Sequence, residues 1–256
     1  MIKSASAFPE QLLFPPCCYL CSAILRRETE DHLRYICRRC LSLLPFNPAL
    51  TRTFPALANE PPADMTLPHW RRTPVPILFS VFLYEGVIRE LILGLKFGGR
   101  RENARLLGSL MAAVLAGELK RLNFRPAGVV PMPLGYKRHR RRGYNQSELL
   151  ADFFAAGLGL EVLPLLVRSR ETARQSELKT LAERKRNVQD AFAPAPGITE
   201  QAFRDRQFIL VDDVLTSGYT MLACAGRLQA AGADVISLVA ASGTGKHFHA
   251  HGHSGD

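Results

Sequence analysis

The stretch FILVDDVLTSGYTM, residues 208–221, constrains the fold of this chain more than any other part of the sequence. Its first four residues are apolar and predict a buried strand, which ends at two adjacent carboxylates, Asp212 and Asp213. A loop of small residues follows, and from Thr220 the spacing predicts a helix that Gly232 closes. A buried strand that leads through a short loop into a helix is typical of an α/β domain with a mostly parallel sheet.

The longer segment around this stretch, residues 77–245, alternates apolar runs with amphipathic segments. We therefore predict an α/β domain, with a parallel sheet flanked by helices, over residues 77–245. Strands are expected at 78–84, 127–133, 208–211 and 235–241, and helices at 85–95, 103–122, 147–158 and 220–231.

Three further segments complete the expected domain organisation. Residues 1–50 contain most of the cysteines and are expected to form a small zinc-ribbon domain. Residues 51–76 hold six prolines and few apolar runs, which predicts an extended, Pro-rich linker. Residues 246–256 form a His-rich tail that is expected to be disordered, although its alternating histidines could also bind a transition metal.

The composition is that of an ordinary globular protein, with 47% hydrophobic and 22% charged residues. The formal net charge of +10 favours anionic partners such as phosphorylated metabolites, nucleic acid or an acidic membrane surface. A solvated basic surface would explain this charge equally well. Since no apolar run approaches the roughly 18 residues of a membrane span and no signal-peptide pattern is present, we expect a cytoplasmic protein without membrane insertion.

The cysteines near the start of the chain follow a regular spacing. Cys18 and Cys21 form one C-x2-C pair, Cys37 and Cys40 form a second, and fifteen residues separate the two pairs. Each pair can turn two thiolates toward one ion, and two pairs complete the closed tetrahedral shell of a structural zinc site. Cys17 lies outside this spacing. The alternative is a set of reduced cysteines without a metal.

The residues that follow the two carboxylates have the chemistry of a phosphate site. Gly218 lets the backbone approach a ligand, and Thr216, Ser217 and Thr220 add hydroxyl groups where a helix begins and its N–H groups favour an anion. The acids would repel that phosphate, so we expect them to meet sugar hydroxyls or a magnesium ion on the same ligand, as in a ribose 5-phosphate. Because adjacent strand residues point to opposite faces, both acids reach one ligand only if the strand ends at Asp212. The alternative is that one of the acids caps the helix.

Several stretches together resemble the ComF family, which is similar to the type I phosphoribosyltransferases and linked by name to competence and DNA uptake. VDDVLTSGYT resembles the motif with which these transferases bind phosphoribosyl pyrophosphate (PRPP). The other matching segments are CYLC and CRRC followed by LP, YEGVIRELILGLKFGGR, VVPMPLGYKRHRRRGYNQSELLA and VRSRETARQSELKTLAERKRNVQDAF. The resemblance implies a type I phosphoribosyltransferase-like fold with an N-terminal zinc ribbon, and binding of PRPP with magnesium.

The resemblance also implies roles for individual residues. The ribose hydroxyls would be held by Asp212 and Asp213. The 5-phosphate would lie on Thr216, Ser217, Gly218, Tyr219 and Thr220. The place of the loop that meets pyrophosphate is taken by Pro133, Leu134 and Gly135. The family pattern R-x3-R-G-[FY]-N-Q is matched by Arg138, Arg142, Gly143, Asn145 and Gln146. A hood over the site is matched by Arg168, Arg170, Thr172, Gln175, Arg184 and Asn187.

The densest positive run, KRHRRR at 137–142, lies between an expected strand and an expected helix. It is expected to contact the pyrophosphate of PRPP or the backbone of single-stranded DNA, and the alternative is a solvated basic loop. Tyr136 and Tyr144 flank the run and are candidate stacking platforms for bases.

The sequence leaves three functions open. The first is a phosphoribosyltransferase that moves the phosphoribosyl group to an unknown acceptor. The second is a non-catalytic factor in DNA uptake that responds to PRPP or binds single-stranded DNA, with DNA-uptake proteins as partners. The third is a zinc-ribbon interaction protein on an inactive scaffold.

Overall fold

The computed structural model describes residues 16–25, 35–52, 77–170 and 191–243. The chain divides into two compact units, Met1–Leu44 and Pro45–Asp256. The expected tail at 246–256, and the expected linker after Arg52, lie outside the described residues.

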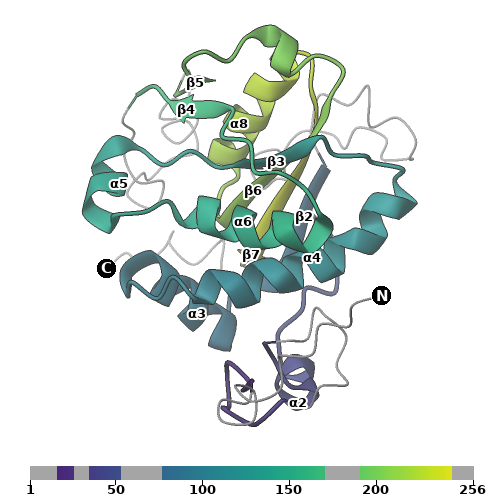
Figure 1. The fold of residues 1–256 in the computed structure, drawn as a ribbon, viewed down its shortest axis with the longest axis vertical. Coiled ribbons are helices and arrows are strands. Elements are labelled where there is room, and N and C mark those ends of the chain that lie inside the picture. The colour runs from purple at the N-terminus through teal and green to yellow at the C-terminus, as the bar shows by residue number, and fades with distance from the viewer. Residues whose placement is uncertain (1–15, 26–34, 53–76, 171–190, 244–256) are drawn as a thin grey trace, which may run out of the picture. The chain divides into compact units, whose positions relative to one another are not determined.

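A five-stranded sheet forms the centre of the larger unit (Figure 1). In spatial order its strands are β1 (Thr51–Arg52), β2 (Ile77–Leu83), β7 (Asp234–Ser242), β6 (Gln207–Leu215) and β3 (Gly128–Pro131). The four strands from β2 to β3 run parallel, and β1 pairs antiparallel with β2. The predicted parallel sheet flanked by helices is therefore confirmed.

The long strands are near-continuous apolar runs because helices cover both faces of the sheet. In β7, every residue after Asp234 is buried. The helices α4 (Asn103–Arg121) and α6 (Gln146–Leu158) lie on one face, and α8 (Tyr219–Ala230) lies on the other (Figure 1). A further helix, α3 (Gly86–Phe97), packs on α4.

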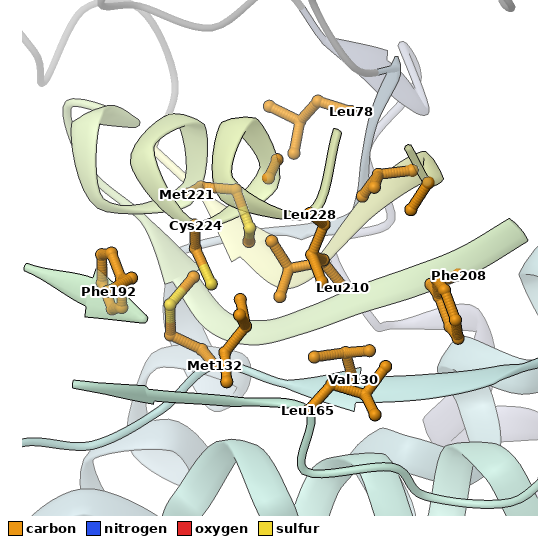
Figure 2. Packing of buried hydrophobic residues seen from close by; sticks show 14 of the residues in the cluster. Leu78, Val130, Met132, Leu165, Phe192, Phe208, Leu210, Met221, Cys224 and Leu228 are labelled. Carbon is orange, nitrogen blue, oxygen red and sulfur yellow. The ribbon is translucent and has the colours of Figure 1, made fainter. Parts of the chain in front are cut away.

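A large hydrophobic cluster fills the space between α8 and the sheet (Figure 2). Met221, Cys224 and Leu228 of α8 belong to this cluster, together with Leu210 of β6 and Val130 of β3. Burial of each leucine or methionine of this kind stabilises the fold by about 1.5–3 kcal/mol. The cluster therefore fixes the start of α8 relative to the end of β6.

The remaining elements of this unit are short. A separate antiparallel pair is formed by β4 (Leu166–Arg168) and β5 (Phe192–Pro194), and the 3-10 turn η4 (Glu200–Ala202) precedes β6. Of the expected hood residues, Arg168 ends β4 and Arg170 follows it. The other four, Thr172, Gln175, Arg184 and Asn187, lie outside the described residues.

Several elements of the larger unit differ from the sequence prediction. Strand β1 falls at the start of the expected linker, 51–76, and strands β4 and β5 were not predicted. Strand β6 runs to Leu215, past the predicted end at residue 211, because Val214 and Leu215 continue the hydrogen-bonded ladder with β7. The basic run forms a helix, α5 (Tyr136–Arg142), which ends at Gly143 in the left-handed conformation with φ 79°. None of the described helices is long and apolar enough to cross a membrane.

In the described part of the smaller unit, residues 38–42 form the short helix α2 (Arg38–Ser42), whose N-cap is Cys37. A backbone bridge joins Cys17 to Ile24, and Ile36 and Leu44 are buried. These elements bring the two C-x2-C pairs together.

Candidate functional site

A cavity of about 280 Å³ lies at the carboxyl ends of β3 and β6, where ligands bind in open α/β sheets. Its walls come from the end of α3, the residues after β3, α5, the start of α6, the end of β4 and the loop between β6 and α8. The charged side chains in these walls are Lys96, Arg138, Arg141, Arg142, Arg168, Asp212 and Asp213. Cations outnumber carboxylates, so the lining has a net positive formal charge and suits an anionic ligand.

Both predicted carboxylates line this cavity, although the strand does not end before them as the sequence argument required. The reason lies in the neighbouring strand. β3 pairs with β6 only as far as Val211, whereas β7 continues alongside to Leu215. Beyond Val211 the β3 side of β6 is therefore open, and Asp212 and Asp213 reach the cavity along this open edge.

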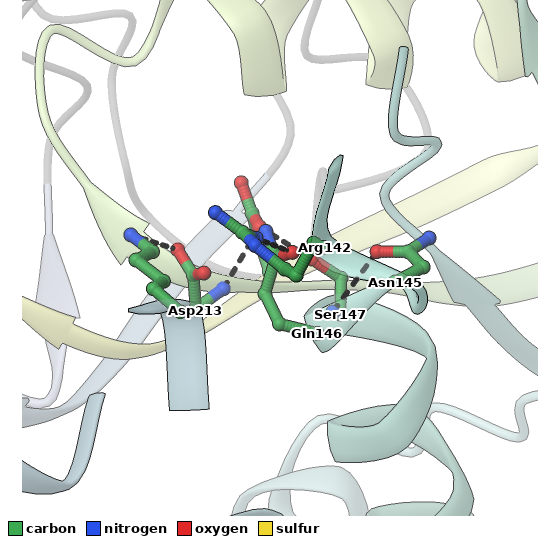
Figure 3. Close-up of polar contacts among 7 residues, drawn as sticks. Arg142, Asn145, Gln146, Ser147 and Asp213 are labelled. Atoms are coloured by element: carbon green, nitrogen blue, oxygen red, sulfur yellow. Dashed lines mark hydrogen bonds and ion pairs between the residues drawn. The ribbon is translucent and has the colours of Figure 1, made fainter. Parts of the chain in front are cut away.

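Each carboxylate is held by a side chain from a different helix. Asp212 Oδ1 accepts a hydrogen bond from Ser147 Oγ of α6 at 2.7 Å and from the N–H of Asp213 at 2.8 Å. Asp213 Oδ1 lies 2.8 Å from Lys96 Nζ at the end of α3 (Figure 3). The other oxygen of Asp213, Oδ2, is buried and receives no hydrogen bond from the described part of the chain. A ligand hydroxyl would satisfy it.

The environment of Asp212 raises the pKa of its carboxyl group to about 6. Burial is the main cause, and the negative charge of Asp213 adds to it. The hydrogen bond from Ser147, the charge of Lys96 and the backbone N–H of Asp213 act in the opposite direction. Two carboxylates held this close together are costly in a fold, which is typical of a functional site.

The loop after β6 presents its groups toward the same cavity. Thr216, Gly218 and Thr220 line the cavity, whereas Ser217 and Tyr219 are not among its lining residues. The hydroxyl of Ser217 is buried and has no hydrogen-bond partner within the described residues. Gly218 has φ 83°, a left-handed conformation that favours glycine, and it precedes the first turn of α8.

The start of α8 has no side-chain cap, so neither carboxylate serves as its cap. This excludes the alternative in which one of the two acids stabilises the helix. The N–H groups of the first turn and the positive end of the helix dipole remain directed toward the loop, where they favour an anion such as phosphate.

Helix α5 contributes two arginines to one wall of the cavity. Arg138 and Arg142 are four residues apart, so they lie on one face, and both are half-buried in the cavity wall. The guanidinium group of Arg142 donates to Gln146 and lies 5.5 Å from the centre of the Phe97 ring. Burial lowers the pKa of Arg142, partly offset by the charge of Asp213, yet arginine keeps its proton in proteins. Arg142 is therefore a fixed cation in the wall.

Residues at the junction of α5 and α6 connect the walls of the cavity through hydrogen bonds (Figure 3). Asn145 caps α6 by accepting from the N–H of Ser147 at 3.1 Å, and its amide donates to the carbonyl of Met132 at 3.0 Å. Gln146 accepts from Arg142, and Ser147 donates to Asp212. The segment thus links the basic helix to the acid pair.

One aromatic expectation is wrong. Tyr144 was a candidate stacking platform, but its ring is buried and its hydroxyl donates to the carbonyl of Leu95. The guanidinium group of Arg101 covers the ring at 4.5 Å. Tyr136, by contrast, is 72% exposed at the start of α5.

Arg141 belongs to the basic run 137–142 that the sequence already indicated. Sequence reasoning did not single out Lys96, Phe97 or Ser147, all of which line the cavity. Lys96 and Phe97 fall in the segment YEGVIRELILGLKFGGR, and Ser147 directly follows the R-x3-R-G-[FY]-N-Q pattern. Their only signal in the sequence was membership of segments that resemble the family. Of the expected pyrophosphate loop, Pro133 and Leu134 line the cavity, and Gly135 is the N-cap of α5.

The four predicted cysteines form a second candidate site, in the smaller unit. The sulfur atoms of Cys18, Cys21, Cys37 and Cys40 all lie within 4.8 Å of one another, and those of Cys21 and Cys37 are 3.7 Å apart. A tetrahedral zinc site with Zn–S bonds of about 2.3 Å has sulfur–sulfur edges of about 3.8 Å. The donor set therefore fits a structural metal such as zinc, and Cys17 is not one of its members.

Backbone N–H groups also suit these sulfurs to carry negative charge. The N–H of Cys37 points to the sulfur of Cys18 at 3.4 Å, and the N–H of Cys40 points to the sulfur of Cys37 at 3.4 Å. Burial acts to raise the pKa of Cys18, but hydrogen bonds led by the Cys37 N–H outweigh it and lower that pKa to about 6. Such N–H groups are a common feature around bound thiolates.

No protein-family model matches the chain. DNA utilization protein YhgH of Escherichia coli K12 is 30% identical over 224 residues, which cover 86% of this chain and 88% of the relative. The protein of the same name from Salmonella typhimurium LT2 is 34% identical over 174 residues, covering 67% of this chain and 71% of the relative. Competence protein F of Haemophilus influenzae is 33% identical over 114 residues, covering 44% of this chain and 48% of the relative. The two YhgH proteins are at least 30% identical to this chain over two thirds or more of both sequences. The protein therefore belongs to the family of YhgH and competence protein F, the ComF family.

Proposed function

We propose that the protein binds PRPP, accompanied by magnesium, in the cavity at the carboxyl ends of β3 and β6. The observation that carries this proposal is the presence of two kinds of group in one cavity. The acid pair offers a buried oxygen that needs a donor, and the loop before α8 offers hydroxyl and N–H donors that suit a phosphate. A ligand that satisfies both carries sugar hydroxyls close to a phosphate, as a ribose 5-phosphate does.

The cationic wall supports the diphosphate end of this ligand. Arg138 and Arg142 lie on one face of α5 and line the same cavity as the loop residues that would hold the 5-phosphate. Arginine matches phosphate oxygens well because its planar group donates several hydrogen bonds in a fixed geometry. Arg168 at the end of β4 lines the same cavity. We assign the diphosphate to this wall.

For the reaction, we propose transfer of the phosphoribosyl group to an acceptor. The bond between C1 of the ribose and the diphosphate breaks, and C1 forms a bond to a nucleophilic atom of the acceptor. The diphosphate leaves with the electron pair while positive charge develops on the ribose ring. Arg138 and Arg142 would stabilise the charge of the leaving group. Magnesium bound to the diphosphate would supply further positive charge.

Calorimetric titration with PRPP and magnesium tests the binding step. We expect Asp212→Asn combined with Asp213→Asn to weaken binding at least tenfold, because both hydroxyl acceptors lose their charge. Glu148→Gln is the matched control, since Glu148 lies exposed in the first turn of α6 and outside the cavity lining. Wild-type protein that binds no PRPP, or an Asn pair that binds as tightly as wild type, would contradict the proposal.

Release of pyrophosphate tests the reaction. Protein, magnesium and PRPP are incubated with nucleobases or with oligonucleotides as candidate acceptors. Release that depends on an acceptor, and that is lost in the Asn pair, is the expected result. If PRPP binds but no acceptor causes release of pyrophosphate, transfer is contradicted and the protein only binds PRPP.

A second candidate function, binding of single-stranded DNA, is favoured by the outer face of α5. Lys137 and Arg140 are exposed on this helix and do not line the cavity, and Tyr136 beside them is 72% exposed. Cations with an exposed aromatic ring suit a nucleic-acid backbone and a stacked base. The names of the relatives, which refer to DNA utilization and competence, support a role of this chain in DNA uptake with DNA-uptake proteins as partners.

Fluorescence anisotropy with an oligonucleotide tests this second function. Lys137→Ala combined with Arg140→Ala should weaken binding and make its dependence on salt less steep, by about 0.7 in the logarithmic slope for each lost phosphate contact. Lys120→Ala, at an exposed position of α4, is the control and should bind like wild type. An unchanged affinity and slope in the double variant would exclude the outer face of α5 as the binding surface.

For the smaller unit, we propose that the four cysteines hold one structural zinc ion. The sulfur–sulfur spacing described above supports this proposal, since it matches the edges of a zinc tetrahedron. Four thiolates complete the shell, so the ion would stabilise the fold and would not catalyse a reaction.

A further inference from the structure

Among the described residues that line the cavity, Lys96 is the one lysine, and its ammonium group lies against the acid pair. Its Nζ is 2.8 Å from Asp213 Oδ1, and the side chains of Lys96 and Asp213 are only 21% and 4% exposed. Ion pairs as enclosed as this one are uncommon, because removing both charges from water costs several kcal/mol per ion. The contact therefore needs a reason beyond stability.

The end of α3 that carries Lys96 is anchored on both sides. Asn103 Nδ2 donates to the carbonyl of Leu91 at 2.7 Å, and the hydroxyl of Tyr144 donates to the carbonyl of Leu95. A Cβ atom on Gly94 would lie 2.8 Å from Asn103 Nδ2, so any other residue at this position would push the Asn103 side chain away. The hydrogen bonds from Asn103 and Tyr144 therefore hold the end of α3 in the position that places Lys96 beside the acid pair.

The ammonium group changes what the acid pair can bind. Two adjacent carboxylates with open oxygens are a hard-oxygen site of the kind that holds divalent cations. Lys96 occupies Oδ1 of Asp213 and adds one positive charge, which leaves the pair with less negative charge and fewer oxygens for a metal. Oδ2 of Asp213 remains buried without a partner in the described structure, and a hydroxyl donor fits it without bringing charge.

The ammonium group also stays charged. Burial acts to lower the pKa of Lys96, but the charge of Asp213, the hydrogen bond to it and the charge of Asp212 outweigh burial and raise that pKa. The position is therefore filled by a permanent cation at neutral pH.

We propose that Lys96 determines the specificity of the acid pair: it takes the place of a divalent cation, so that the pair binds hydroxyl groups and a metal ion enters only with the ligand's diphosphate. That the hydroxyl groups belong to a ribose rests on the proposed function. The exclusion of a metal ion by Lys96 does not depend on that function and can be tested without PRPP.

Binding of Mn²⁺ to the full chain, without PRPP, tests the proposal by electron paramagnetic resonance at about pH 8, which is above the Asp212 pKa of about 6. Lys96→Met keeps the length of the side chain and removes its charge. We expect this variant to gain a Mn²⁺ site at least ten times tighter than any in wild type. Adding Asp213→Asn to Lys96→Met should abolish the gain, and Lys120→Met, at the exposed position on α4, should bind like wild type.

Lys96→Met that folds, as judged by circular dichroism, and binds Mn²⁺ no better than wild type would overturn the proposal. If the variant does not fold, the wild-type protein decides. A Mn²⁺ site in wild type that Asp213→Asn removes would overturn the proposal, and its absence would support it. Wild-type protein that does not bind PRPP would contradict the proposed function. The Mn²⁺ measurements would still decide the role of Lys96.

Discussion

Asp212 illustrates, at the scale of a single residue, how a site for a ligand lowers the stability of the fold. Its folded pKa of about 6 lies above the ordinary value of 3.8. For an acid whose pKa is raised on folding, the stabilising contribution is fully present below the unfolded pKa and is lost as pH rises through the folded pKa. Asp212 therefore destabilises the protein most above about pH 6.

Asp212→Asn removes this penalty and retains an oxygen that can accept from Ser147. At about pH 7.5 we expect the variant to unfold with a free energy higher than wild type by on the order of 1–3 kcal/mol. The difference should disappear toward about pH 4, where the wild-type carboxyl is protonated. Denaturant unfolding across this pH range measures it, with Glu148→Gln as control. An Asn variant that is less stable than wild type at the higher pH would show that Asp212 is not held at a cost.

The sequence shows the acids of the site but not the lysine that neutralises them. Asp212 and Asp213 stand out because two charges beside an apolar run are unusual. Lys96 is one of many basic residues, and it occupies the last turn of an amphipathic helix where lysine is common. Only the packing of α3 against α4 and Tyr144 brings it to Asp213, and such long-range contacts leave no local pattern in a single sequence.

At the scale of elements, the turn from α5 to α6 joins the arginines of α5 to the acid pair. Gly143 ends α5, and Asn145 starts α6 while bonding to the end of β3. Both bonds of Asn145 are buried. The turn therefore sets where Ser147 meets Asp212.

Asn145→Ala should lower the free energy of unfolding by about 2–3 kcal/mol, because the cap of α6 is lost and the carbonyl of Met132 is left buried without its donor. Asn145→Asp retains the capping oxygen and should lose less than Ala does. Chemical denaturation of the three proteins measures the two contributions. Equal stability of wild type and the Ala variant would mean that the turn does not depend on this side chain.

The four parallel strands of the sheet could be predicted because strands buried on both faces form long apolar runs. The antiparallel strand β1 could not, because it has only two residues, Thr51 and Arg52, at the start of the Pro-rich segment. The end of β6 could not, since its ladder with β7 outlasts its ladder with β3, and a single sequence does not show which strands are neighbours. The helix α5 was not predicted because its residues are nearly all basic, so no spacing of apolar residues indicates a helix. Its arginines nevertheless use helical spacing to place Arg138 and Arg142 on one face.

At the scale of the whole molecule, the chain combines a cysteine unit, Met1–Leu44, with a larger unit built on the sheet. The described residues of the smaller unit include few buried apolar side chains, among them Ile36 and Leu44. A unit with so small a core usually needs a metal or disulfides to fold. The C-x2-C spacing predicted the cluster in full, because metal ligands in such pairs are close in sequence as well as in space.

Purified protein should contain about one zinc ion per chain by elemental analysis. Cys37→Ser should lose the zinc and make the smaller unit sensitive to protease, since the energy of metal binding is part of its folding energy. Cys17→Ser is the matched control, because Cys17 is not in the cluster, and it should retain the zinc. Zinc-free wild-type protein, or loss of zinc in Cys17→Ser, would contradict the assignment of ligands.

The central claim, that the cavity beside β6 takes a ribose with a 5-phosphate and a diphosphate, is tested most directly by a crystal structure with PRPP and magnesium bound. The account predicts the 5-phosphate on the loop residues 216–220, the ribose hydroxyls on Asp212 and Asp213, and the diphosphate beside Arg138 and Arg142. Lys96 should still contact Asp213, and the metal should lie on the diphosphate. A ligand seated elsewhere, or a magnesium ion held directly by the two carboxylates, would contradict the account.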